Sequence, residues 1–291
     1  MKNTSLPFGL SDQNSSVRSK PNQKMARTFL LGIGLALVAS TTSQAAVVAY
    51  WDLDTVNEGL SGTGGTLSGD AAVGATPIAP GGSGSLTTTT GIFDSNMVAN
   101  DITGFGGTGS FTVLSWFQTS SATDQTIFNY SPTIGSTGGA DLRFFVNSDG
   151  AFRVEMSDGS GFNLGSVDLN DGATHMVGVI FDSSTGNSFY DLDLYVDGTI
   201  YDVTSGNDNT INLSGSGANI IFGMNQPNNN NIEKQFVGTI DDVVIYDEAL
   251  GATALASIAT NGVAIPEPSS FALLLASGVG ALAFLRRRQS A

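Results

Sequence analysis

The sequence predicts an all-β fold, an antiparallel sandwich of short strands, and three observations support this. Between Val47 and Tyr246 the apolar residues recur with the two-residue period of β-strands. Clusters of Gly, Asn, Asp and Ser separate most of these runs, as turns between strands do. Helical segments do not alternate with the strands, which argues against a parallel sheet built from βαβ units.

Residues 1–45 are predicted to be a secretory signal peptide rather than part of this fold. From Met25 the chain has a basic start, an apolar run over residues 29–39, and small residues at Ser43 and Ala45 that fit a cleavage site. The run is shorter than the roughly 20 residues of a membrane-spanning helix, which disfavours a permanent anchor. The sequence leaves open whether translation starts at Met1 or at Met25.

The strands are predicted in order from residue 47, where VVAYW opens the sandwich. Residues 111–118 are apolar on both faces, which is typical of a strand that is covered on both sides. Asp149-Gly150 and Asp197-Gly198 mark two hairpins, because Asp-Gly readily adopts the positive φ angles of a tight turn. The other predicted strands read QTIFNY, DLRFFV, AFRVEM, HMVGVIFD, LDLYV, ANIIFGM and FVGTIDDVVIY.

Three segments depart from the strand pattern. Residues 59–90 are rich in Gly, Thr and Ser and are predicted to form a long surface excursion. The sequence NQPNNNNIEK, from residue 225, is predicted to be a loop. Residues 247–259 read as a short helix, because Leu250, Leu255 and Ile258 are spaced for one apolar stripe.

The charge of the central region restricts its partners. Between residues 46 and 265 the chain has 24 acidic and three basic residues, a net charge of −21 against −15 for the whole chain. The basic residues are Arg143, Arg153 and Lys234. Such a surface repels nucleic acid and anionic lipid, because contacts to phosphate need Lys and Arg. The absence of cysteine excludes disulfides, thiol catalysis and Cys-based metal sites.

The order of three segments resembles the late strands of laminin G-like, concanavalin A-like jelly-roll domains. The segments are DGATHMVGVIFD, then LDLYVDG, then FVGTIDDVVIYDEALGATALASI. The opening strand is similar to the first strand of that family, which pairs with the last one. The family's usual tryptophan before the histidine is missing, since Ala173 and Thr174 precede His175. The resemblance implies an antiparallel jelly-roll sandwich over residues 46–263.

The end of the chain resembles the PEP-CTERM sorting signal of Gram-negative bacteria. An acidic turn between prolines is followed by an apolar stretch and three arginines, and we expect a sorting signal over 264–291 with a transmembrane helix over 269–285. The residues of the motif are Pro266, Glu267, Pro268, Arg286, Arg287 and Arg288. The positive-inside rule places these arginines in the cytoplasm. The resemblance implies processing by an exosortase; a plain membrane anchor of the same topology is the alternative.

Catalysis is the less favoured interpretation. Retaining glucanases of the concanavalin A-like fold need two carboxylates about 5–5.5 Å apart, and the chain lacks their E-x-D-x-x-E arrangement. The aspartate pairs 191/193 and 241/242 remain as a conceivable acid and base. His175 is the only histidine and is expected to be structural, since no Ser or Cys nucleophile motif lies nearby. Trp51 and Trp116 are expected in the core.

Acidic residues near the ends of the first and last strands indicate a structural calcium site. If these strands pair, Asp52 or Asp54 comes close to Asp241 or Asp242. Carboxylate and backbone carbonyl oxygens are the ligands that Ca²⁺ prefers. The spacing of an EF-hand loop is absent, so this hypothesis rests on acidity and on relatives of the fold that carry calcium at such a strand end.

Together these observations predict an exported, non-catalytic protein of the cell surface or the exopolysaccharide matrix. We expect it to be held at the bacterial inner membrane, then processed, and to bind carbohydrate or a partner protein through loops at one rim. One expected contact surface is the loop that contains Asn228, Asn229, Asn230 and Asn231. The alternatives are a glycan-degrading enzyme of the same fold and a structural surface component without a ligand.

Overall fold

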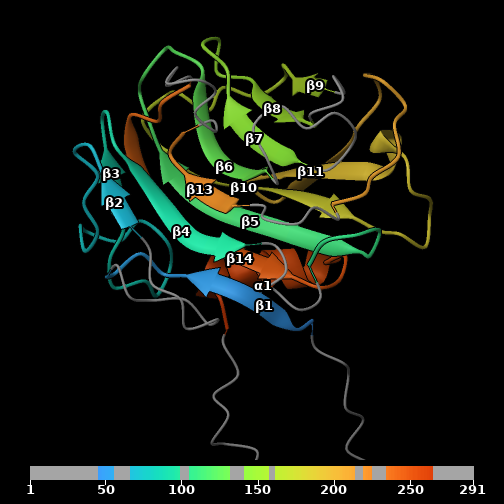
Figure 1. Ribbon diagram of the computed structural model, residues 1–291, viewed down its shortest axis with the longest axis horizontal. Helices are drawn as coiled ribbons and strands as arrows, with labels where there is room; N and C mark the ends of the chain where they lie inside the picture. The colour runs from blue at the N-terminus through green and yellow to red at the C-terminus, as the bar shows by residue number, and fades with distance from the viewer. Residues whose placement is uncertain are drawn as a thin grey trace, which may run out of the picture. The chain divides into compact units, whose positions relative to one another are not determined.

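The computed structural model describes residues 45–55, 66–98, 105–131, 141–156, 161–213, 219–224 and 234–264. These residues belong to the unit that Ala45–Ala291 forms, and they build two antiparallel sheets in two layers (Figure 1). Three predicted segments lie almost entirely outside the described ranges. They are the signal peptide up to residue 44, the Asn-rich loop up to residue 233, and the sorting motif from residue 265. Within those ranges no helix is long and apolar enough to cross a membrane.

The first sheet contains both ends of the domain. Its seven strands have the spatial order β1-β14-β5-β10-β11-β12, and β3 also pairs with β14. They are β1 (Val47–Trp51), β3 (Leu86–Thr88), β5 (Phe111–Gln118), β10 (Thr174–Phe181), β11 (Leu192–Val196), β12 (Thr199–Asp202) and β14 (Gly238–Tyr246). The first and last strands pair as predicted, with Trp51 opposite Val243.

The second sheet also has seven strands, in the order β2-β4-β13-β6-β7-β8-β9. They are β2 (Thr66–Ser68), β4 (Ile92–Val98), β6 (Gln125–Ser131), β7 (Leu142–Val146), β8 (Phe152–Glu155), β9 (Gly161–Leu164) and β13 (Asn219–Phe222). A 3₁₀ turn, η2 (Phe189–Asp191), leads into β11. The two sheets together confirm the predicted antiparallel sandwich.

The main core lies between the two sheets and is rich in aromatic rings. Trp51 of the first sheet meets Phe222 of the second edge-on, with ring centroids 5.2 Å apart. Phe222 also stacks on Phe93 at 5.6 Å and lies 6.2 Å from Phe128. All four side chains are fully buried, and burial of each contributes roughly 1.5–3 kcal/mol of hydrophobic free energy. The prediction that Trp51 packs in the core is confirmed.

A smaller apolar cluster covers the outward face of the first sheet. Helix α1 (Ala252–Asn261) buries Leu255 and Ile258 in a cluster that also contains Leu114 and Trp116 of β5. This cluster explains why β5 is apolar on both faces, and it confirms the predicted helix and the buried position of Trp116. The helix ends at Asn261, and the N–H of the following Gly262 donates to the Ile258 carbonyl at 2.8 Å. The positive φ of Gly262, 80°, then turns the chain away from the helix.

The two predicted hairpins have different turns. Asp197 and Gly198 both have positive φ, 45° and 95°, and Val196 lies opposite Thr199, so this turn is the tight one predicted. At the other hairpin only Gly150 has a positive φ, 82°. There β7 ends at Val146 and β8 begins at Phe152, so the turn is longer than the Asp-Gly pair indicated.

Residues 66–90, the described part of the predicted surface excursion, contain regular structure. Two three-residue strands, β2 and β3, pair with β4 and β14 respectively. Leu86 of β3 is fully buried in the main core. The carboxylate of Asp70 holds the following turn by accepting the N–H of Thr89 at 3.1 Å and that of Thr90 at 2.7 Å. The sequence did not predict these two strands, because a run of only three residues is too short to show the period of a strand.

Candidate functional site

The four aspartates predicted as calcium ligands lie at the β1–β14 end of the first sheet. The two on β14 are buried at a bulge, where Asp242 has a φ of 45° and the pairing with β5 shifts register. Asp241 Oδ2 accepts the N–H groups of Ile78 at 2.8 Å and Ala79 at 2.9 Å. Asp242 Oδ1 accepts the Tyr50 hydroxyl at 2.5 Å.

The two aspartates that follow β1 interact electrostatically with those on β14. Burial, followed by the charges of Asp241, Asp52 and Asp54, raises the pKa of Asp242 to about 7. Burial is also the main reason that the pKa of Asp241 rises to about 6. Asp52 Oδ1 accepts the N–H of Asp54 at 3.1 Å, and Asp54 Oδ2 accepts the Ser83 hydroxyl. The structure therefore gathers carboxylates without a neighbouring cationic side chain among the described residues.

Two carboxylate oxygens of this cluster are suited to a cation. Oδ1 of Asp54 and Oδ1 of Asp241 are buried and have no hydrogen-bond partner, an arrangement that is costly unless a proton or a metal ion compensates it. The backbone comes close to both side chains: a Cβ at Gly84 would lie 2.4 Å from Asp54 Oδ1, and one at Gly82 would lie 3.5 Å from Asp241 Oδ2. However, no three His, Cys, Asp or Glu side chains within the described ranges are placed to hold a metal, so carbonyl or water oxygens would have to complete the ligand set.

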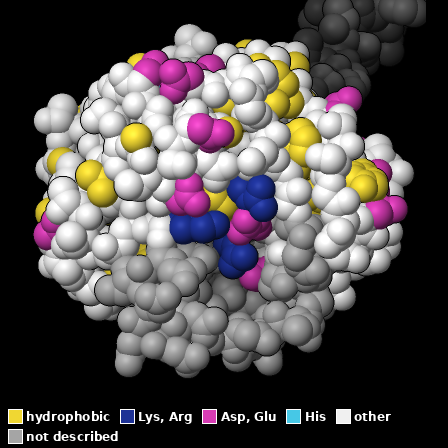
Figure 2. Space-filling model, turned by 90° about the horizontal axis from the view of Figure 1, so that it is seen from above, with side chains coloured by type: hydrophobic (Ala, Val, Ile, Leu, Met, Phe, Trp, Pro, Cys, Tyr) yellow, Lys and Arg dark blue, Asp and Glu magenta, His cyan; other side chains and the backbone are white. Residues whose placement is uncertain are grey.

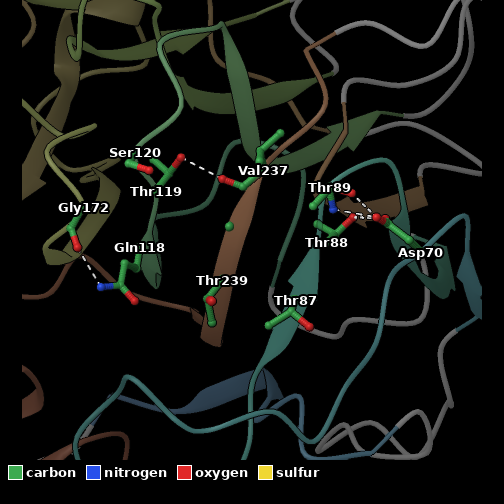
Figure 3. Close-up of a pocket in the computed structure, with 11 residues that line it drawn as sticks. Asp70, Thr87, Thr88, Thr89, Gln118, Thr119, Ser120, Gly172, Val237 and Thr239 are labelled. Carbon is green, nitrogen blue, oxygen red and sulfur yellow. Dashed lines mark hydrogen bonds between the residues drawn. The ribbon is translucent and has the colours of Figure 1, made fainter.

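A polar groove of about 470 Å³ crosses the first sheet at β3, β14 and β5 (Figure 3). Thr87, Thr239 and Gln118 form a cross-strand row in it, because Thr239 lies opposite Thr87 on one side and Gln118 on the other. The neighbouring residues Leu86 and Ile240 point into the main core, so alternation directs the row outward. We call this surface the threonine groove.

Hydrogen bonds from side chains to backbone carbonyls hold the walls of the threonine groove in place. Gln118 Nε2 donates to the Gly172 carbonyl at 2.7 Å, and the Thr119 hydroxyl donates to the Val237 carbonyl at 2.8 Å (Figure 3). The hydroxyls of Ser120 and Thr239 have no hydrogen-bond partner in the part of the chain that the structure describes. The groove thus offers hydroxyl and amide groups to a ligand, and the described residues that line it include no aromatic ring.

The only histidine anchors one wall of this groove. His175 Nδ1 lies 2.6 Å from Asp197 Oδ2, and Nε2 lies 3.1 Å from Asp171 Oδ1. The hydrogen bond to Asp197, and then that to Asp171, raise the pKa of His175 although burial opposes them. Asp171 immediately precedes Gly172 of the groove wall. This geometry supports the structural role expected of the histidine.

The structure separates one predicted carboxylate pair and forms another. Asp191 caps η2, where its carboxylate accepts the Ser188 N–H at 2.8 Å; Asp193 instead lies opposite Asp202. Burial, and then the Asp202 carboxyl, raise the pKa of Asp193. Asp191 and Asp193, which the sequence left as a conceivable acid and base, therefore do not pair with each other in the structure. The two-residue turn at Asp197-Gly198 was the signal for the correct pair, since it fixes the register between β11 and β12.

Comparison with known families identifies this architecture. The family model described as the concanavalin A-like lectin/glucanases superfamily matches residues 89–256, more than half of the chain. The chain belongs to this superfamily. A second model, the PEP-CTERM protein-sorting motif, matches residues 264–289, so both predicted resemblances are confirmed. No curated protein sequence matches the chain.

Solved structures share the jelly roll of this superfamily member at low identity. Domain 4 of AbnA, an extracellular arabinanase from Geobacillus stearothermophilus solved with arabinotriose, is 15% identical; the match covers 75% of this chain and 100% of that one, with a TM-score of 0.53. The CBM40 of a Ruminococcus gnavus sialidase, solved with α2,3-sialyllactose, is 13% identical over 53% and 84% of the two chains, with a TM-score of 0.42. A SAP-like pentraxin from Limulus polyphemus is 16% identical over 54% and 73%, with a TM-score of 0.41. The likeness to the arabinanase domain, at 15% identity, shows the fold alone.

Proposed function

We propose that the chain is an exported surface protein whose jelly-roll domain binds polysaccharide through the threonine groove. The observation that carries this proposal is the outward row of Thr87, Thr239 and Gln118 across three strands. A rigid sheet presents these groups at fixed spacing, as recognition of repeating sugar hydroxyls requires. The superfamily includes lectins, and the similar arabinanase domain was solved with arabinotriose.

The neutral polar groups of the threonine groove favour weak binding of a polysaccharide by one copy of the domain. A hydrogen bond between neutral groups contributes about 0.5–1.5 kcal/mol net, so four such bonds give an affinity in the roughly millimolar range. No aromatic ring lies in the groove to add stacking on a sugar. Many copies on one surface that contact one polymer would then supply the attachment strength.

The carboxylate in the groove supports binding without catalysis. Among the described residues, Asp70 is the only acidic one that lines it. The hydroxyl of Thr89 and the N–H groups of Thr90 and Thr89 lower the pKa of Asp70, so it is a poor proton donor at neutral pH. A glycoside hydrolase needs one protonated carboxyl group opposite a second carboxylate, and the groove has neither. A glycan-degrading enzyme is therefore not the preferred function.

The tail supports the proposed location. The match of residues 264–289 to a sorting motif includes Pro266, Glu267, Pro268 and the three arginines. We propose that an exosortase processes this tail at the inner membrane of a Gram-negative bacterium and releases the domain to the surface or its exopolysaccharide. Fractionation of cells with and without the exosortase tests this. A tail that stays intact in exosortase-containing cells, or a domain found in the cytoplasm, would refute it.

A structural calcium ion is proposed for the acidic end. Asp54 and Asp241 would supply the two unpartnered oxygens, and nearby backbone carbonyls would supply others. Millimolar Ca²⁺ should raise the melting temperature, and Asp54→Asn should reduce that rise. Asp208→Asn, on an exposed loop, is the control. An equal rise in all three proteins, or no rise in the unaltered chain, would exclude the site.

Binding by the threonine groove is tested with neutral polysaccharides. Retardation of the chain in native gels that contain arabinan or dextran should decrease in Thr239→Val and Gln118→Ala. Thr185→Val is a matched control, because Thr185 is an exposed turn residue away from the groove lining. If all variants migrate like the unaltered chain while it is retarded, the groove is not the binding site.

A further inference from the structure

The three cations of the domain lie together on the outward face of the second sheet. Arg143 is on β7, Arg153 is on β8, and Lys234 is in the segment that leads to β14. All three contact one side chain, Glu155. Figure 2 shows the dark-blue side chains gathered on one face, beside magenta carboxylates. We call these four residues the cationic cluster. Elsewhere, residues 46–265 contain only acidic and neutral side chains apart from one histidine.

Cross-strand register builds this cluster. Arg143 lies directly opposite Glu155, and Phe145 lies opposite Arg153. Glu155 Oε2 accepts Arg143 Nε at 2.9 Å, and Oε1 accepts Arg153 Nε at 2.6 Å. Lys234 Nζ lies 3.5 Å from Oε2. The Glu155 carboxylate therefore contacts all three cationic side chains.

Two of the cations keep donors that the described residues do not use. Arg153 spends Nε on Glu155 and Nη1 on Asn163 at 3.0 Å, while its Nη2 has no hydrogen-bond partner among the described residues. A Cβ at residue 161 would lie only 2.6 Å from Nη2, so Gly161 leaves room for this guanidinium. Lys234 Nζ lies 3.6 Å from the centroid of the Phe145 ring, which positions the ammonium group by a cation–π contact.

A groove of about 380 Å³ adjoins these donors. Arg153, Lys234 and Glu155 line it. Its lining also includes Asn147, Asp124 and Asp149, at and near the β7–β8 turn. The groove therefore combines cationic donors with amide and carboxylate oxygens, which accept hydrogen bonds from hydroxyl groups.

The same face has a further unused polar group. Asn129 on β6 lies opposite Arg143, in the row that continues to Glu155. Its side chain is fully buried, and neither amide atom has a hydrogen-bond partner among the residues that the structure describes. Buried polar groups are normally paired. This face of the sheet thus has more hydrogen-bonding capacity than the fold consumes.

We propose that the cationic cluster is a second glycan site, which binds the carboxylate of an acidic sugar such as a uronic acid. The carboxylate would lie against Arg153 Nη2 and Lys234 Nζ, and the sugar hydroxyls would face Asn147, Asp124 and Asp149. A neutral sugar lacks the charge that makes Arg and Lys contacts strong. Elsewhere the acidic surface of the domain repels polyanions, so this patch directs where an acidic polysaccharide can attach.

Calorimetry on the full chain with trigalacturonate, trimannuronate and triguluronate tests this proposal. At least one trimer should bind at 50 mM NaCl and should bind more weakly at 200 mM NaCl, because the donors are partly exposed. Methyl esterification of that trimer removes the charge and retains the hydroxyls, so binding should be lost. Arg153→Gln should weaken binding about tenfold or more, as loss of a charged hydrogen bond does.

Controls separate this site from the threonine groove. Lys234→Gln should also weaken binding, whereas Lys234→Arg should retain it; thermal melting verifies that each variant is folded. Gln118→Ala, in the threonine groove, should leave uronate binding unchanged. The proposal is overturned if no trimer binds, if the methyl ester binds equally well, or if folded Arg153→Gln and Lys234→Gln bind like the unaltered chain. Each of these results leaves the proposed binding of neutral polysaccharide untouched.

Discussion

Replacement of His175 by Asn should remove a pH-dependent part of the stability. The His175 side chain is only 10% exposed. Its ring lies between two carboxylates, with Nδ1 2.6 Å from Asp197 Oδ2 and Nε2 3.1 Å from Asp171 Oδ1. Asn can still donate from the position of Nδ1 toward Asp197, but it carries no charge and cannot reach Asp171. The variant therefore tests charge with little change in packing.

The size of the effect follows from the bond between His175 and Asp197. A hydrogen bond to a charged group contributes about 1.5–3 kcal/mol. The Asp197 side chain is 44% exposed, so solvent screening favours the lower end, about 1.5 kcal/mol. For a domain of this size that loss lowers the melting temperature by roughly 3–6 °C.

The direction of the pH dependence is fixed by the raised pKa of His175 in the folded state. The unfolded histidine titrates near pH 6.5, so the stabilisation is fully present below that pH. It is lost as the pH rises through the higher pKa of the folded state. The free energy of unfolding should therefore differ more between the unaltered chain and His175→Asn at pH 5.5 than at pH 9.

Urea unfolding at the two pH values measures this difference, and NMR titration measures the pKa directly, since the chain has one histidine. Other titrating groups contribute to both proteins and cancel in the comparison. A His175 pKa at or below 6.5, or a stability difference that is the same at both pH values, would refute the reasoning.

Three further predictions concern stability and use the urea midpoint as the measurement. Phe222→Ala should cost about 3–5 kcal/mol, because this ring contacts Trp51 and two other aromatic rings in the core; a cost below about 1 kcal/mol would contradict that packing. Gly178→Ala should cost about 1–3 kcal/mol by overpacking, because its Cβ would lie 2.4 Å from the Val113 carbonyl oxygen; an unchanged midpoint would contradict the close strand approach. Gly198→Val should cost about 1–2 kcal/mol through the φ of 95° alone, since nothing lies within 4 Å of a Cβ at this position. Gly165→Val is its control, because Gly165 also has open space around it but is not among the glycines of positive φ.

The sequence could predict those features that depend on local patterns. Alternation located most long strands, and the Asp197-Gly198 turn set the register of β11 against β12. The closing strand and its helix were recognisable from FVGTIDDVVIYDEALGATALASI. Trp51 and Trp116 were correctly assigned to buried positions because the strands that carry them are flanked by apolar residues.

The cationic cluster could not be predicted because it depends on the length of one turn. A two-residue turn at Asp149-Gly150 would pair Arg143 with Met156, whereas the longer turn pairs it with Glu155. A one-residue slip moves every side chain of a strand to the other face. The three-residue strands β2 and β3 were missed for a different reason: their partners are distant in sequence, and so few residues show no period.

The pairing of β1 with β14 has a consequence for the order in which the domain can fold. Residue 47 finds its partner only at residue 246, and β14 lies between β1 and β5 in the sheet. Contacts so remote in sequence form slowly, since a long loop must close first. The first sheet therefore cannot be completed until residue 246 has been synthesised, and its first strand stays without its partner for most of the synthesis of the domain.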